Sequence, residues 1–335
     1  MSKNKVYLSK RGLLIIGITS LVILIVGIIL YYTDLNEAFY SESGQTFFKI
    51  ITYLGEPVVF IIITAIIYLA YDKVYAKNLG LSLLFTTYMN QLFKSIVKDP
   101  RPPTNEPSVG EFIEESYGFP SGHSQTAVGF WGYVSYEFKD NYVYKRIQIV
   151  PCILSVIIFL VAISRIIIGV HDLQDIIGGL LLGIGFLLLF IYAEPMLSKQ
   201  FNKMNFIAKM IVTVIVSVAL FLVGTLIFPE AGTGLVTPQP LYTDKGNFAV
   251  VGGVLLGFGV GYLLEQEYVK YDPSKVSTRD KIINILIGIV LLLVVFIPFE
   301  YLITIDSVYF RFFRYALPTF ILAYVVPLIC TKINK

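Results

Sequence analysis

The sequence of 335 residues predicts an all-α integral membrane protein with about ten transmembrane helices. Hydrophobic residues make up 56% of the chain, charged residues make up only 15%, and the mean hydropathy is +0.74. The apolar residues also occur in long blocks rather than in amphipathic stripes, which is typical of membrane-spanning helices. A soluble protein of this length would need far more charge on its surface.

Ten apolar blocks are candidate spans, and we expect a helix in each of them. The first block follows a basic segment, as in a secretory signal, but it is long enough to cross a bilayer and no small-residue cleavage site follows it. We therefore predict an uncleaved first span. The blocks are 12–32, 57–71, 79–97, 122–138, 147–168, 172–193, 207–228, 247–264, 281–299 and 311–331.

The basic residues predict the orientation of these spans. With the N-terminus in the cytoplasm, 18 of the 26 Lys and Arg residues fall on the inner side. The positive-inside rule therefore predicts a multi-pass cell-membrane protein with both termini in the cytoplasm. The three polar motifs described below then share the extracytoplasmic end of the helices.

Glycines at four-residue spacing in 179–183 and 253–261 predict close helix contacts. Cys152 and Cys330 lie far apart in apolar runs, so neither a disulfide framework nor a zinc site is expected. No basic tract interleaved with aromatic residues indicates a nucleic-acid partner.

The first of three polar motifs runs from Ser164 to Asp175. His171 and Asp175 are one helical turn apart, so their side chains are expected to share a face and to form a hydrogen bond. An aspartate that accepts from one imidazole nitrogen leaves the other free as a nucleophile. Arg165 is a permanent planar cation suited to phosphate.

The second motif, Pro120–Ser121–Gly122–His123, has the pattern of a helix start with Ser121 as its cap. The backbone N–H groups of such a first turn point at an anion, and Gly122 permits close approach. His123 would then lie where it can protonate a departing alkoxide.

The third motif contributes two more cations. We expect Lys94 in the last turn of a helix and Arg101 in a stiff loop, because Pro100 and Pro102 prevent a continuous helix. With Arg165 they supply three positive charges for a phosphoryl group.

Charged residues near the motifs also have less specific interpretations. The loop before Pro120 holds four glutamates, which we interpret as a solvated acidic loop, with gating of anion entry as the alternative hypothesis. Arg311 and Arg314 are predicted to anchor the last span at the interface, with a place at a substrate entrance as the alternative hypothesis. The four glutamates are Glu106, Glu111, Glu114 and Glu115.

Together, the three motifs resemble the signature of the type 2 phosphatidic acid phosphatase superfamily, over about residues 12–195. The resemblance implies a six-helix catalytic core, residues 1–195, followed by a C-terminal extension of about four transmembrane helices of unknown role, residues 196–335. The resemblance implies metal-independent hydrolysis of a phosphomonoester or pyrophosphate, with no cofactor. His171 would be the nucleophile, Asp175 would orient it, and His123 would be the general acid and base. Phosphate would be bound by Lys94, Arg101, Ser121, Gly122 and Arg165.

The expected substrate is a membrane lipid: a polyprenyl diphosphate, phosphatidate or phosphatidylglycerol phosphate. One alternative is a soluble sugar phosphate, as in glucose-6-phosphatase, a larger relative with more than six spans. A second alternative, in a different class, is a transporter that binds a phospholipid or anion without turnover. The paired histidines and Asp175 favour the enzyme, because anion binding alone does not need them.

Overall fold

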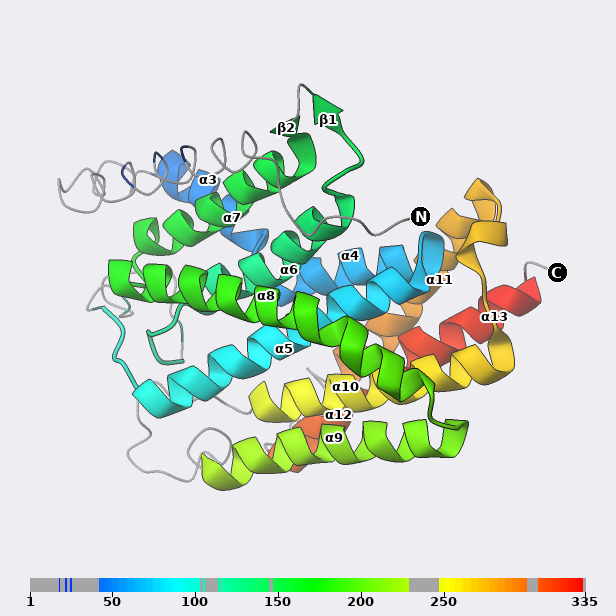
Figure 1. Cartoon of the computed structure of the whole chain (residues 1–335). Coiled ribbons are helices and arrows are strands. Elements are labelled where there is room, and N and C mark those ends of the chain that lie inside the picture. Colours follow the sequence, from blue (N-terminus) through cyan, green and yellow to red (C-terminus); the bar gives the residue numbers. More distant parts are fainter. Residues whose placement is uncertain are drawn as a thin grey trace. The chain divides into compact units, whose positions relative to one another are not determined.

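The computed structural model describes residues 42–102, 105, 114, 116–144, 147–228, 247–299 and 307–333, together with 18, 22 and 25. The described chain is almost entirely helical (Figure 1). The fold-class prediction is confirmed: the chain is an all-α, multi-pass membrane protein. The first predicted span, 12–32, lies outside the described residues except for positions 18, 22 and 25.

A helix occupies each of the remaining predicted spans. They are α4 (Pro57–Ala70), α5 (Lys73–Val97), α6 (Gly122–Phe138), α7 (Ile149–Ile167), α8 (Leu173–Asn202), α9 (Phe206–Ile227), α10 (Asn247–Leu264), α11 (Thr278–Ile297), α12 (Val308–Phe320) and α13 (Val326–Ile333). Residues 265–269 and 321–325 continue α10 and α12 as π-helix, and residues 273–275 form a 3₁₀ turn. A short hairpin, β1 (Val143–Tyr144) with β2 (Ile147–Gln148), precedes α7.

Two features differ from the expectation. Within the described residues, six helices are long and apolar enough to cross a membrane, or seven if the bent pair 46–53 and 57–70 is one span. Helix α6 has only 17 residues, and α5 buries the polar residues Asn90, Gln91 and Lys94, so both are less like spanning helices than predicted. In addition, helix α3 (Glu42–Tyr53) lies in a segment that was expected to be a connection.

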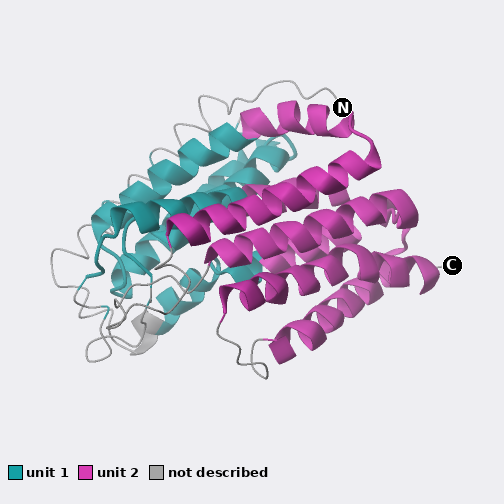
Figure 2. Ribbon diagram, turned by 90° about the horizontal axis from the view of Figure 1, so that it is seen from below, with its two compact units in different colours: residues 1–60, 85–190 teal, residues 61–84, 191–335 magenta. Residues whose placement is uncertain are grey.

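The helices group into two compact units (Figure 2). Unit 1 comprises residues 1–60 and 85–190, and unit 2 comprises residues 61–84 and 191–335. The sequence-based division at residue 195 remains a prediction. All of the predicted site residues belong to unit 1.

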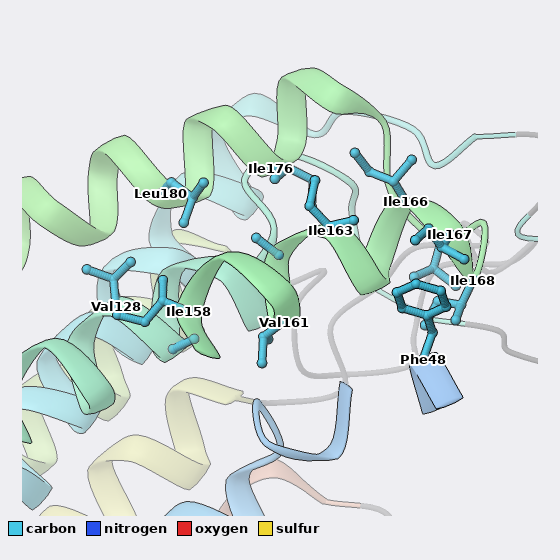
Figure 3. Close-up of a cluster of buried hydrophobic side chains, with 13 residues drawn as sticks. Phe48, Val128, Ile158, Val161, Ile163, Ile166, Ile167, Ile168, Ile176 and Leu180 are labelled. Carbon is cyan, nitrogen blue, oxygen red and sulfur yellow. The ribbon is translucent and has the colours of Figure 1, made fainter. Parts of the chain in front are cut away.

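The core of unit 1 packs around α7 and the start of α8. Phe48 of α3, Val128 of α6 and Leu180 of α8 meet a row of apolar side chains from α7 (Figure 3). The row consists of Ile158, Val161, Ile163, Ile166 and Ile167. This packing fixes the ends of α6, α7 and α8, where the polar motifs lie.

The glycine spacings produce the close helix contacts that the sequence predicted. A Cβ on Gly183 would lie 2.9 Å from Cβ of Val128, so α8 approaches α6 closely within unit 1. In unit 2, a Cβ on Gly253 or Gly257 would collide with the backbone carbonyls of Phe312 and Ala316 in α12.

Candidate active site

A tight turn after α7 places His171 directly before α8. Gly169 has φ 77°, a left-handed conformation that favours glycine at a helix end. The N–H groups of Gly169 and Val170 donate to the carbonyls of Ile166 and Arg165, which satisfies the last turn of α7. The chain therefore reverses direction within a few residues and brings His171 back over the end of α7.

His171 and Asp175 form the expected hydrogen bond, with 2.9 Å between Nδ1 and Oδ2. Its local geometry differs from the prediction, because His171 precedes α8 instead of lying within it. The same Oδ2 accepts the backbone N–H of Asp172 at 3.2 Å, as in a capping box at a helix start. The Asp175 carboxylate therefore caps the start of α8 and also fixes the orientation of the His171 imidazole.

Arg101 contacts the other nitrogen of His171. Its Nη1 lies 3.0 Å from His171 Nε2 and 2.7 Å from the carbonyl oxygen of Val170, while Nε and Nη2 donate to Ser116. A guanidinium can only donate, so Nε2 is the accepting nitrogen and Nδ1–H donates to Asp175. This tautomer carries its lone pair on Nε2.

The surroundings of His171 favour its neutral form. Burial, followed by the positive charges of Arg101, Lys94 and Arg165, holds the pKa of His171 well below its usual range. His123 also acts on it electrostatically. The three motifs therefore converge around one imidazole, whose neutral form has the lone pair that a nucleophile needs.

Lys94 and Arg101 lie where the sequence placed them, in the last turn of α5 and in the coil after it. Lys94 Nζ donates to the carbonyl oxygens of Tyr117 and Gly118. A Cβ on Gly118 would lie 3.1 Å from Asp175 Oδ2. It would also lie 2.9 Å from the carbonyl oxygen of Pro100, so a larger residue at this position would push the loop away from Pro100 and Asp175.

Ser121 caps α6 as predicted, and its Oγ accepts from the N–H of Ser124 at 3.4 Å. Its own N–H donates to the carbonyl of Asp175 at 3.0 Å. A Cβ on Gly179 would lie 2.7 Å from the carbonyl oxygen of Ser121, so a larger residue there would separate the two helix starts. The second motif therefore contacts Asp175 in the first turn of α8 and Gly179 in its second turn.

Asn90, which no sequence motif singles out, supports the start of α6. Its Nδ2 donates to the carbonyl of Pro120 at 3.1 Å and to Oε1 of Gln125 at 2.9 Å. A Cβ on Gly122 would lie 3.3 Å from Asn90 Oδ1. The only signal was a buried polar side chain in a predicted span, which marks functional positions in membrane helices.

Arg165 is 1% exposed and pairs with a residue interpreted as part of a solvated loop. Its Nη1 donates to Thr52 Oγ1 at 2.8 Å, and its Nη2 pairs with Glu114, which also lies 3.9 Å from Arg101. The solvated-loop interpretation is therefore wrong for Glu114, because a buried guanidinium requires a counter-charge. The other three glutamates lie outside the described residues.

The pKa of Glu114 records this pairing. Burial raises the pKa of the carboxyl, but the charges of Arg165, His123 and Arg101 lower it more, to about 2. Glu114 is therefore an anion at any physiological pH, set against two of the three predicted phosphate-binding cations.

His123 lies in the first turn of α6, and its Nε2 is 3.0 Å from Oε1 of Glu56. Glu56 directly precedes α4 and was also missed, since no spacing in the sequence links it to the motifs. Among the described residues, no group of three or more His, Cys, Asp or Glu side chains could hold a metal ion. The metal-free mechanism remains a prediction.

Comparison with known proteins places these residues in a family. Residues 75–199 match the model of the PAP2 superfamily, and residues 249–335 match that of the PAP2 superfamily phosphatase, transmembrane extension. The first match contains all eight predicted site residues, and the second covers most of the C-terminal helices. Those helices therefore have counterparts among phosphatases of the superfamily.

Two curated relatives are similar to part of the chain. Lipid phosphate phosphatase delta of Arabidopsis thaliana is 27% identical over 121 residues, 32% of this chain and 28% of the relative. Phosphatidylglycerophosphatase B of Bacillus subtilis (strain 168) is 33% identical over 107 residues, 31% of this chain and 53% of the relative. No solved structure matches the chain. By its two family matches, the chain carries a PAP2 superfamily domain followed by the transmembrane extension found in phosphatases of that superfamily.

Proposed function

We propose that this protein is a membrane lipid phosphatase that hydrolyses a phosphomonoester or pyrophosphate through a phosphohistidine on His171. One observation carries the proposal. His171 is buried, its Nδ1 is held by Asp175 at 2.9 Å, and its Nε2 faces the guanidinium of Arg101 at 3.0 Å. In a nucleophile toward phosphate, the carboxylate fixes the tautomer and the nearby cation binds the phosphoryl oxygens, and a structural histidine needs neither.

The reaction proceeds in two displacements. The Nε2 lone pair of His171 attacks phosphorus while the bond from phosphorus to the ester oxygen breaks, and that oxygen takes a proton from His123. A water oxygen then attacks phosphorus and gives a proton to His123. The P–N bond electrons return to Nε2, which releases inorganic phosphate and restores both histidines.

Cations and backbone donors stabilise the transferring group. Arg101, Arg165 and Lys94 offset the charge on the phosphoryl oxygens, and the N–H groups of the first turn of α6 point at one of them. Gly122 allows this close approach, and Ser121 fixes the turn. The roles of these residues as phosphate ligands belong to the proposal.

The lipid class of the substrate is supported by the relatives. One is named for lipid phosphates and the other for phosphatidylglycerophosphate. We extend this to three candidates: phosphatidylglycerol phosphate, phosphatidate and a polyprenyl diphosphate. The distribution of Lys and Arg supports an extracytoplasmic site with both termini in the cytoplasm.

The test is phosphate release by the full chain in detergent or liposomes. The panel contains the three lipids and glucose 6-phosphate, and each substrate is assayed with the wild type, His171→Ala and Glu137→Gln, an exposed residue of α6. We expect lipid hydrolysis by the wild type and the Glu137 variant, and a loss of at least 10³-fold in His171→Ala.

A ³²P-labelled acid-labile adduct that requires His171 would identify the phosphohistidine. Release from glucose 6-phosphate alone would overturn the lipid class. Counterflow of a lipid phosphate or inorganic phosphate by liposomes containing His171→Ala, without hydrolysis by the wild type, would favour a transporter instead.

A further inference from the structure

We infer that Glu56 is a positioning residue for His123 and that it selects Nδ1 as the proton-transferring nitrogen of that histidine. The inference rests on the proposed hydrolysis and deepens it. A carboxylate only accepts hydrogen bonds, so the 3.0 Å contact between Glu56 Oε1 and His123 Nε2 requires the proton on Nε2. In the described part of the chain, no hydrogen bond involves Nδ1 of His123, which leaves that nitrogen for the substrate.

Glu56 is held in position by the turn between α3 and α4. The N–H of Glu56 donates to the carbonyl of Tyr53, and its own carbonyl accepts from Val59 and Phe60 in the first turn of α4. The indole N–H of Trp131, on the same helix as His123, donates to the carbonyl of Leu54 at 2.9 Å. The turn is therefore fixed to α6 independently of the Glu56 side chain.

Gly55 permits the close approach that the contact needs. A Cβ at this position would lie 2.7 Å from Cγ1 of Val161 and 3.0 Å from Cδ2 of His123. Any larger residue would push the turn away from the imidazole and from α7. Phe60 adds a second anchor, since its ring stacks on Phe130 of α6 with the centroids 4.3 Å apart.

The two histidines then use opposite nitrogens. Asp175 holds Nδ1 of His171 and exposes Nε2, whereas Glu56 holds Nε2 of His123 and exposes Nδ1. Each carboxylate fixes one ring nitrogen, and therefore both the tautomer and the ring orientation. Two imidazoles that must act on opposite sides of one phosphorus, one as nucleophile and one as acid, each need such a fixed ring.

The local charges fit a histidine that gives and takes a proton. Burial and the charge of Arg165 oppose the imidazolium of His123, whereas the charges of Glu56 and Glu114 favour it. Glu56 is the only one of these three side chains for which a hydrogen bond to the His123 ring is found among the described residues. In the first displacement, the Nδ1 proton moves to the ester oxygen as its bond to phosphorus breaks, and Glu56 stabilises the imidazolium before that transfer.

The experiment compares two leaving groups in the full-length enzyme. An alkyl phosphate such as phosphatidate needs a proton on its departing oxygen, whereas p-nitrophenyl phosphate departs as a stable anion. For Glu56→Gln we expect kcat/KM on the alkyl phosphate to fall about 10-fold or more, within the 10²- to 10⁴-fold range of proton-transfer catalysis. We expect p-nitrophenyl phosphate to lose less than about threefold, and Glu56→Asp to recover part of the alkyl phosphate activity.

Two further readouts separate positioning from folding. Adding Glu56→Gln to a His123→Asn background should cause no further loss on the alkyl phosphate, since both changes act on one proton. The alkaline limb of the kcat/KM profile should move to lower pH in Glu56→Gln, and Glu137→Gln should leave it unchanged.

An equal loss on both substrates, or an additive loss in the double variant, would overturn the positioning role and leave a structural one. If Glu56→Gln hydrolyses the alkyl phosphate as fast as Glu137→Gln does, the positioning role is overturned as well. The wild-type assay tests the proposed hydrolysis separately from the role of Glu56. If the wild type releases phosphate and needs His171, hydrolysis stands whatever Glu56 does.

Discussion

Each unit buries an ion pair, and the two pairs differ in how completely their charges are satisfied. In unit 2, both oxygens of Glu265 accept from Lys73 Nζ at 2.8 Å, and Oε1 also accepts the N–H of Tyr271 at 2.6 Å. In unit 1, Arg165 bonds to Thr52 and Glu114, but its Nε has no hydrogen-bond partner among the described residues. We call the Lys73–Glu265 pair closed, because both carboxylate oxygens accept hydrogen bonds. We call the Arg165–Glu114 pair open, because Arg165 Nε can still donate a hydrogen bond.

The exposure of the two glutamates differs in the same direction. The Glu265 side chain is fully buried, whereas that of Glu114 is 32% exposed. A carboxylate that is fully paired and inaccessible is a structural element, since no ligand can replace it. A carboxylate at the surface that neutralises a buried arginine can be exchanged for another anion. We therefore expect the Arg165 pair to affect ligand binding and the Glu265 pair to affect stability.

The largest expected effect comes from removing Arg165, the cation of the open pair. Arg165→Ala should lower kcat/KM for the lipid phosphate about 10²- to 10³-fold, because it removes a buried donor to the transferring group. Arg165→Lys should recover little, since an ammonium cannot reproduce the planar fork. Phosphate release measures the effect, with Glu265→Gln as the control in which kcat/KM is retained. A loss confined to the Glu265 variant would reverse the assignment of the two pairs.

The closed pair should affect stability instead. Glu265→Gln leaves Lys73 without its counter-charge and should lower the free energy of unfolding by about 3 kcal/mol. The double variant Lys73→Met with Glu265→Leu should regain most of that loss, because it buries no charge. Thermal unfolding in detergent, scored by intrinsic fluorescence, compares the three proteins. An unchanged midpoint in Glu265→Gln would show that the pair is not structural.

The sequence predicted the spanning helices well because their signal is local. Helix α6 occupies 122–138 as predicted, with Ser121 as its cap, since an apolar run and a capping residue are both read within a few positions. Helix α3 was missed because its 12 residues include polar ones at its start and it is too short to cross a bilayer. A search for long apolar blocks does not detect such a helix.

Only those site residues could be predicted whose residue type is unusual in an apolar sequence. The histidines and basic residues of the motifs stand out in apolar sequence because burying charge is costly there. Their partners do not stand out: Glu56 pairs with His123 across 67 positions, and Glu114 pairs with Arg165 across 51. Such pairs depend on how the helices pack, so neither spacing nor periodicity in the sequence identifies them.

A smaller effect should show whether the Glu114 carboxylate, unlike that of Glu265, can be replaced by another anion. If Glu114 competes with phosphate for Arg165, Glu114→Gln should lower the inhibition constant of orthovanadate up to about fivefold, since a partly exposed ion pair contributes at most about 1 kcal/mol. Inhibition of phosphate release measures it, with Glu137→Gln as the matched loss of one charge. Weaker inhibition in Glu114→Gln would show that the carboxylate orders Arg165 for its ligand instead of competing with it.

The smallest effect concerns the charge state of the nucleophile in the resting enzyme. Burial and the charges of Arg101, Lys94 and Arg165 oppose protonation of His171, so its folded-state pKa lies below that of an exposed histidine. As the pH falls through about 6.5, where an ordinary histidine becomes half protonated, His171 should stay neutral and keep its Nε2 lone pair.

The chain offers a direct measurement, because it contains only two histidines. Protein labelled with ¹³C at histidine Cε1 gives two signals, and His171→Ala assigns them. The His171 signal should keep its neutral chemical shift through the pH range in which an exposed histidine titrates. A normal titration would mean that the cations do not surround this imidazole as the unit 1 geometry requires, and the distinction between an open and a closed ion pair would lose its catalytic meaning.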